Sequence, residues 1–264
     1  MITLSKVRPR AVSLVKRVIK RRLLGGKFRS KSFRFGTVTG REVPVLMCLW
    51  NRPGRIADVL RMLDEQDFVD GIDLFLWNNN RADHATYLEA LAESTATQAL
   101  KRVTIAKTPF NLGSIGRFYW ARKLALTGQR GPLVVIDDDE DFTSDFISTC
   151  VATYQPRVAS GWWAFSVGDS YYDRAPSDVG GRVDHVGPGG MVCNAELFKD
   201  PKFFTTLPEQ FWMLDDLWFS FFVKQSGYSL AKLPVEIEFV LAETNQHHTQ
   251  ADLKREFFDF LYPR

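Results

Sequence analysis

The sequence has few cysteines and no long apolar run, and these shortages exclude several classes of protein. Its three cysteines are widely spaced and odd in number, so they form neither a zinc-binding pattern nor a disulfide framework. No apolar stretch approaches the ~20 residues that cross a bilayer, and the basic N-terminus lacks the apolar core of a secretory signal. Internal repeats are also absent. We therefore expect a protein of the reducing cytoplasm.

Acidic residues are missing from the start of the chain, where thirteen lysines and arginines precede Glu42. Residues 4–24 are predicted to form a helix with an apolar stripe and a basic opposite face, ended by Gly25-Gly26 and followed by a linker to residue 42. Such a helix is typical of a segment that lies on an anionic membrane surface. Nucleic acid as the bound anion, and a solvated leader without a role, are the alternatives. We expect a peripheral protein at the inner face of the cell membrane, with no nucleic-acid partner.

The rest of the chain has the composition of an ordinary globular protein, with 45% hydrophobic and 25% charged residues among its 264. Strand and helix patterns alternate over its first part. The predicted strands are 43–50, 72–77, 103–106 and 133–136, and the predicted helices are 55–66, 85–94 and 116–126. This alternation predicts an α/β fold with a doubly wound, mostly parallel sheet. The later part is less regular, with strands expected at 161–167 and 235–241 and a helix at 215–227.

An acid cluster follows the fourth predicted strand. Residues 133–136 are all apolar and β-branched or aliphatic, and five acids come directly after them, at positions 137–141. Ligands bind just outside the carboxyl ends of parallel strands. Carboxylates crowded at such an edge repel one another unless a cation lies between them, and oxygen ligands favour Mg²⁺ or Mn²⁺. The alternative is a solvated acidic turn after a core strand.

Several further motifs follow the predicted strands and helices in a fixed order. They are Asn51-Arg52-Pro53, Asn78-Asn79-Asn80, Asn111-Leu112-Gly113, Asp137-Asp138-Asp139, Gly187-Pro188-Gly189-Gly190-Met191, and Leu214-Asp215-Asp216-Leu217-Trp218 with the trailing Gly227-Tyr228. This series, over about residues 44–250, resembles nucleotide-sugar glycosyltransferases of the GT-A fold, and most of all the family 2-like group. The resemblance implies a Rossmann-like, mostly parallel sheet with flanking helices. It divides the chain into a basic segment and linker (1–42), a donor-binding half (43–142), an acceptor-binding and catalytic half (143–250), and a C-terminal helix or tail (251–264).

The resemblance also implies roles for the motifs of the donor half. The nucleotide-binding residues would be Asn51, Arg52, Asn78, Asn79, Asp137 and Asp138. Mn²⁺ or Mg²⁺ would be held by Asp137 and Asp139, with a further ligand from His247 or His248, although two exposed loop histidines are the alternative. In the family, an aspartate commonly accepts a hydrogen bond from the uracil imide where this chain has Asn78-Asn79-Asn80, and an asparagine can still accept that bond through its amide oxygen. The departure leaves the base open: UDP is the favoured nucleotide, and GDP or another base is the alternative. The alternative to a nucleotide-binding role is an Asn-rich turn that caps the next helix.

In the acceptor half, the resemblance places the catalytic base at Asp216, with Asp215 in place of the usual glutamate. A carboxylate there would deprotonate the acceptor hydroxyl in an inverting transfer, although two acids at a helix start also complement its dipole. The acceptor-binding residues would be Gly189, Gly190, Trp212 and Trp218. The expected acceptor is a hydroxyl of a glycan or a lipid-linked glycan.

Two other functions compete with a glycosyltransferase. A nucleotidyltransferase or nucleotide-sugar pyrophosphorylase also combines an α/β sheet with acidic metal ligands. That class expects a glycine-rich Lys/Arg loop after the first strand, which residues 50–54 match poorly. A non-enzymatic membrane-binding module would use residues 1–41, but it gives no reason for acids at separate strand and helix ends.

Overall fold

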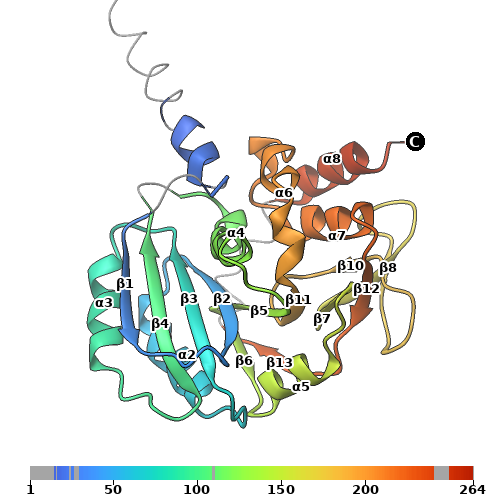
Figure 1. The fold of residues 1–264 in the computed structure, drawn as a ribbon. Coiled ribbons are helices and arrows are strands. Elements are labelled where there is room, and N and C mark those ends of the chain that lie inside the picture. Colours follow the sequence, from blue (N-terminus) through green and yellow to red (C-terminus); the bar gives the residue numbers. More distant parts are fainter. Residues whose placement is uncertain are drawn as a thin grey trace, which may run out of the picture.

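The computed structural model describes residues 15, 17–23, 25–26, 30–108, 111–240 and 250–263. Within these ranges, eight strands form the central sheet in the order β1-β4-β3-β2-β5-β11-β7-β12. The strands are β1 (Ser32–Gly36), β2 (Val43–Leu49), β3 (Ile72–Asn78), β4 (Leu100–Lys107), β5 (Pro132–Asp137), β7 (Val158–Gly161), β11 (Met191–Asn194) and β12 (Ser229–Lys232). Strands β2 to β5 are mutually parallel, which confirms the mostly parallel α/β sheet (Figure 1).

The sheet is covered on both faces, because the central strands β2 and β3 are buried at every position. All seven residues of β2 are buried, and alternate side chains point to opposite faces. Val45 and Met47 join one core and Leu46 and Cys48 the other. The first core contains residues of α2 (Ile56–Asp64), α3 (His84–Glu93) and α5 (Phe146–Thr153), and the second contains residues of α4 (Phe118–Leu126), α6 (Lys202–Thr205), α7 (Asp215–Gln225) and α8 (Ala251–Leu261).

Strand β11 joins the two halves of the chain into one sheet. It pairs antiparallel with β5 on one side and with β7 on the other. Two small sheets flank it: β10 (His185–Val186) with β8 (Ala164–Val167) and β9 (Arg174–Pro176), and β13 (Ile237–Phe239) with β6 (Glu140–Phe142). Because β13 and β6 pair, residues 237–239 lie beside the segment that directly follows β5.

Three sequence predictions of elements need correction. The single strand expected at 161–167 is two strands, β7 and β8, which belong to different sheets. The expected linker contains β1, whose exposed–half-buried alternation suits an edge strand paired with β4. The last expected strand is only Ile237–Phe239 within the described residues, because its pairing partner β6 has three residues. The other predicted helices and strands match within a few residues.

The N-terminal helix lies only partly within the described residues. Residues 15 and 17–23 are helical and end in a turn at Gly25 and Gly26, as predicted. Leu23 is buried against the core, whereas Val15 and Val18 are 56% and 44% exposed. The remainder of the predicted segment 4–24 falls outside the described residues. No helix in the described ranges is both long and apolar enough to cross a membrane.

Candidate active site

A cavity of about 420 Å³ opens at the carboxyl ends of β2, β3 and β5. The first half of the chain lines it with Trp50, Asn51, Arg52, Asp137, Asp138 and Asp139. The second half adds Pro188, Met213, Asp215, Asp216, Phe239 and Lys254. Both acidic motifs therefore line one cavity at the edge of the sheet where α/β folds bind ligands.

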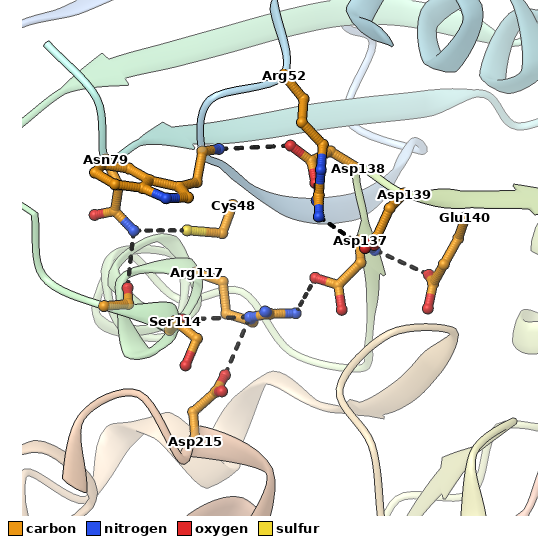
Figure 2. Close-up of polar contacts among 12 residues, drawn as sticks. Cys48, Arg52, Asn79, Ser114, Arg117, Asp137, Asp138, Asp139, Glu140 and Asp215 are labelled. Carbon is orange, nitrogen blue, oxygen red and sulfur yellow. Dashed lines mark hydrogen bonds and ion pairs between the residues drawn. The ribbon is translucent and has the colours of Figure 1, made fainter. Parts of the chain in front are cut away.

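The residues Asp137, Asp138 and Asp139, called the acid turn here, do not alternate in direction as an extended strand would. Strand β5 ends at Asp137, and the next two residues form a turn. Arg52 contacts both of them, with Nη1 2.5 Å from Asp138 Oδ1 and Nη2 3.1 Å from Asp139 Oδ2 (Figure 2). Asp137 instead faces Arg117. Asp139 therefore belongs to the turn and not to the strand, and the assignment of Asp137 and Asp139 as metal ligands stays a prediction.

Arg117 connects the acid turn to the second acidic motif. Its Nη1 lies 2.5 Å from Asp137 Oδ1 and its Nε 3.1 Å from Asp215 Oδ2, so the guanidinium bridges the two carboxylates (Figure 2). Burial opposes the charge of this side chain, but the two neighbouring carboxylates outweigh it and raise the pKa of Arg117. Sequence reasoning missed this residue. Its signal was an arginine among apolar residues, directly before Phe118, where a buried charge requires a partner.

Asp215 and Asp216, called the helix pair here, begin α7 and differ in exposure. Asp215 is 4% exposed, and burial raises its pKa to about 6 against the opposing effect of Arg117. The side chain of Asp216 is 20% exposed and lines the cavity, and its Oδ1 accepts a hydrogen bond of 2.8 Å from Leu217 N. His185 Nε2 lies 3.8 Å from Asp216 Oδ2. Burial lowers the pKa of His185 to about 4, so this ring is neutral at pH 7.

The glycine loop packs on the carboxylates of Glu140 and Asp137. A Cβ at Gly189 would collide with the Glu140 carboxylate and lie 2.9 Å from Asp137 Oδ2, so no larger residue fits without a shift. Gly190 adopts a φ of 62°, which favours glycine. Glu140 itself is 1% exposed and accepts a hydrogen bond from Asp137 N, and burial raises its pKa well above the usual range. The loop thus supports the acid turn, and its predicted contact with the acceptor stays a prediction.

The asparagines of the predicted nucleotide site lie in different environments. Asn51 is exposed and lines the cavity beside Arg52. Asn79 also lines it, but its amide is fully used inside the protein: Oδ1 accepts from Trp77 Nε1 and Leu112 N, and Nδ2 donates to Cys48 Sγ and Gly113 O. Asn78 has no exposed surface and lies 3.3 Å from His84. The side chains of Asn78 and Asn79 therefore hold the ends of the strands in place.

The expectation that Trp212 and Trp218 present a face to a sugar needs correction. They are 7% and 4% exposed, and their indole N–H groups donate to the backbone carbonyls of Leu207 and Phe203. Both belong to the aromatic core around α7 because that helix is packed on most of its circumference. The aromatic side chains that line the cavity are Trp50 and Phe239.

A divalent cation suits the chemistry of the acid turn without a preassembled cage. Within the described ranges, no three Asp, Glu, His or Cys side chains form a metal-binding group. Ions such as Mg²⁺ often take only one or two carboxylates and complete their shell with phosphate and water oxygens. The oxygens of Asp137 and Asp139 fit that pattern. His247 and His248, predicted as further ligands, lie outside the described residues.

Solved structures with the same architecture share little sequence with this chain. A mannosyltransferase from Pyrobaculum calidifontis, in complex with GDP-Man and Mn²⁺, matches 90% of this chain and 67% of its own, with a TM-score of 0.54 and 15% identity. TarS from S. aureus matches 83% of this chain and 42% of its own, with a TM-score of 0.50 and 13% identity. TarS 1-349 in complex with UDP matches 73% and 57%, with a TM-score of 0.48 and 14% identity.

The chain therefore spans about half the length of the TarS chains that it matches. No protein-family model matches the sequence, and a search of curated proteins finds no match either. The sheet order and the likeness to the mannosyltransferase structure together show a GT-A type of glycosyltransferase fold.

Proposed function

We propose that this protein is a metal-dependent glycosyltransferase that moves a sugar from a nucleotide-sugar to a hydroxyl acceptor, with inversion at the sugar carbon. One observation carries the proposal: the acid turn and the helix pair line the same cavity, and Arg117 forms ion pairs with a carboxylate of each group. One acidic group serves the donor and the other the acceptor. The likeness to a mannosyltransferase that binds GDP-Man and Mn²⁺ supports this reading.

On the donor side, Asp137 and Asp139 would hold Mn²⁺ or Mg²⁺, which supplies positive charge to the departing diphosphate. Arg52 keeps the carboxylates of Asp138 and Asp139 in place from the β2 side of the cavity. Asn51 and Trp50 lie beside it and are positioned to contact the nucleotide. UDP remains the favoured nucleotide, and the GDP-Man complex of the similar structure makes GDP the alternative.

On the acceptor side, Asp216 is the general base that removes the proton of the attacking hydroxyl. Its carboxylate reaches the cavity and lies at the N-terminus of α7, where the helix dipole favours the charged form. Asp215 has a different task, because it is buried and holds Arg117. It positions the arginine that also orients Asp137.

A direct test compares Asp139→Ala with the native chain in calorimetric titrations of UDP and GDP in the presence of Mn²⁺. We expect the variant to lose nucleotide binding, because Asp139 forms an ion pair at the cavity. We expect it to stay folded, because Asp139 is a turn residue. Asp141→Ala is the matched control, since its half-exposed carboxylate contacts Arg55 and does not line the cavity. Equal nucleotide affinity in the native and Asp139→Ala chains would contradict the assignment. A hydrolysis screen across UDP-, GDP- and dTDP-sugars then identifies the donor.

We further propose that the protein acts at the inner face of the cell membrane on a glycan or lipid-linked glycan. The support is the basic N-terminal helix, on which Val15, Val18, Arg21 and Arg22 are exposed. Arg21→Gln together with Arg22→Gln should reduce the free energy of binding to anionic vesicles by roughly 2 kcal/mol, because each such cation contributes ~1 kcal/mol near the surface. Vesicle flotation measures this binding. Arg61→Gln on the exposed face of α2 is the control. Equal flotation with anionic and neutral vesicles would refute a membrane role.

A further inference from the structure

The cavity contains a cation to which the proposed chemistry assigns no task. Lys254 of α8 lines the cavity, although only 7% of the residue is exposed. The other lining cations, Arg52 and Arg117, each contact two carboxylates. Within the described part of the chain, Lys254 has no carboxylate partner; its Nζ lies 5.6 Å from the centroid of the Tyr171 ring.

A lysine that is almost fully buried is normally paired, and within the described residues Lys254 has no carboxylate partner. Removing the charge from water is unfavourable unless hydrogen bonds or an opposite charge replace the hydration. The face of Tyr171 replaces only part of it. An anion that entered the cavity would supply the missing partner.

Packing contacts place this ammonium on the side of the cavity that belongs to Asp216. The Tyr171 ring lies against His185 at 5.7 Å between centroids and nearly perpendicular to it. His185 in turn lies 3.8 Å from Asp216. The charge of Lys254 also contributes to the lowered pKa of His185, which agrees with this position. The acid turn has its own cation, Arg52, on another wall.

We propose that Lys254 binds an anionic group, a phosphate or a carboxylate, on the acceptor molecule beside its reacting hydroxyl. This rests on the proposed function, because it takes Asp216 as the base for that hydroxyl. The acceptor is then a phosphorylated or carboxylated polyol or glycan rather than a neutral sugar. The helix pair alone would repel such a group, and Lys254 compensates for that repulsion.

The test measures the binding of glycerol 3-phosphate, glycerate and neutral glycerol to the full chain saturated with Mn²⁺ and UDP, or GDP where GDP binds better. We expect the native protein to bind an anionic probe together with the nucleotide and in preference to glycerol. Lys254→Met keeps the apolar stem and removes the charge, so it should weaken that binding roughly 10- to 100-fold. Lys254→Arg should restore most of it. Arg255→Gln, one position along and 61% exposed, removes an equal charge outside the cavity and should change nothing.

Two results would overturn the inference while nucleotide binding stands. In one, neither anionic probe binds better than glycerol. In the other, Lys254→Met weakens nucleotide binding by the same factor and the anionic probe competes with the nucleotide, so Lys254 serves the donor phosphates. If the native chain binds neither UDP nor GDP, the proposed function fails first and the inference with it. Loss of folding in Lys254→Met would show in its unfolding midpoint, and Lys254→Arg would then decide between the outcomes.

Discussion

Asp138 in the acid turn and Asp215 in the helix pair are 5% and 4% exposed, and each lies against an arginine. Their neighbours Asp139 and Asp216 are more open, with side chains 13% and 20% exposed. In each group, one carboxylate is almost buried against an arginine and another is more open to the cavity. The groups differ in support: the acid turn follows a parallel strand, and the helix pair begins a helix. We infer that the buried member positions an arginine and the open member meets a ligand.

The largest effect should come from the open member of the helix pair. Asp216→Asn keeps shape and most hydrogen bonding but removes basicity, so sugar transfer should fall by ~10²–10⁴-fold with donor affinity nearly unchanged. Asp215→Asn should lower transfer less, because that carboxylate acts through Arg117. Steady-state rates together with calorimetric donor affinities separate the two variants. Near-native transfer by Asp216→Asn would reverse the assignment within the pair or indicate a retaining enzyme, and NMR of the product anomer decides which.

The next effect tests the bridge between the two groups. Arg117→Met leaves Asp215 as a buried carboxylate without its counter-charge, which should destabilise the fold by about 3–5 kcal/mol. Adding Asp215→Asn should recover part of that loss, since the double variant buries no unpaired charge there. Urea unfolding of the two single variants and the double variant measures the coupling. Additive losses would show that the bridge is not an energetic unit.

The smallest of the three effects is a pH dependence of stability. It concerns the helix pair, because that group has a buried histidine beside it. The lowered pKa of His185 means that the unfolded chain takes up a proton between about pH 6.5 and 4 while the folded chain does not. Stability should therefore fall as the pH falls through this window. His185→Gln should remove about 2–3 kcal/mol of that loss, measured by unfolding at pH 7 and pH 4.5. An unchanged pH slope would mean that the ring is already protonated in the fold.

Much of the fold followed from local patterns. Strands β2 and β5 contain continuous apolar runs, and β3 is apolar except at Asp73 and Asn78. The helices between them show a three- to four-residue spacing, so the positions of these elements were predicted within a few residues. The ends of these strands carry the polar motifs, and parallel strands bring their ends to one edge. The acid turn could thus be placed at a ligand-binding edge from the sequence.

Other features of the site depended on contacts between distant segments. Trp212 and Trp218 looked like candidates for a sugar face, but the packing around α7 buries them, and the sequence pattern of an aromatic residue is the same in both settings. Lys254 belongs to a C-terminal helix whose position over the cavity follows from its packing against α7 and Tyr171. None of these three residues could be assigned from its neighbours in sequence.

The sequence by itself determined the elements of the donor half and the order of the motifs at the strand ends, because periodicity and turn chemistry are local. The tertiary structure alone decided that β11 inserts between β5 and β7. It also decided that Arg117 joins Asp137 to Asp215 and that Lys254 lines their cavity. The physical reason is that a buried charge pairs with the carboxylates that the folded chain brings near it. That choice depends on the packing of segments far apart, which no local pattern records.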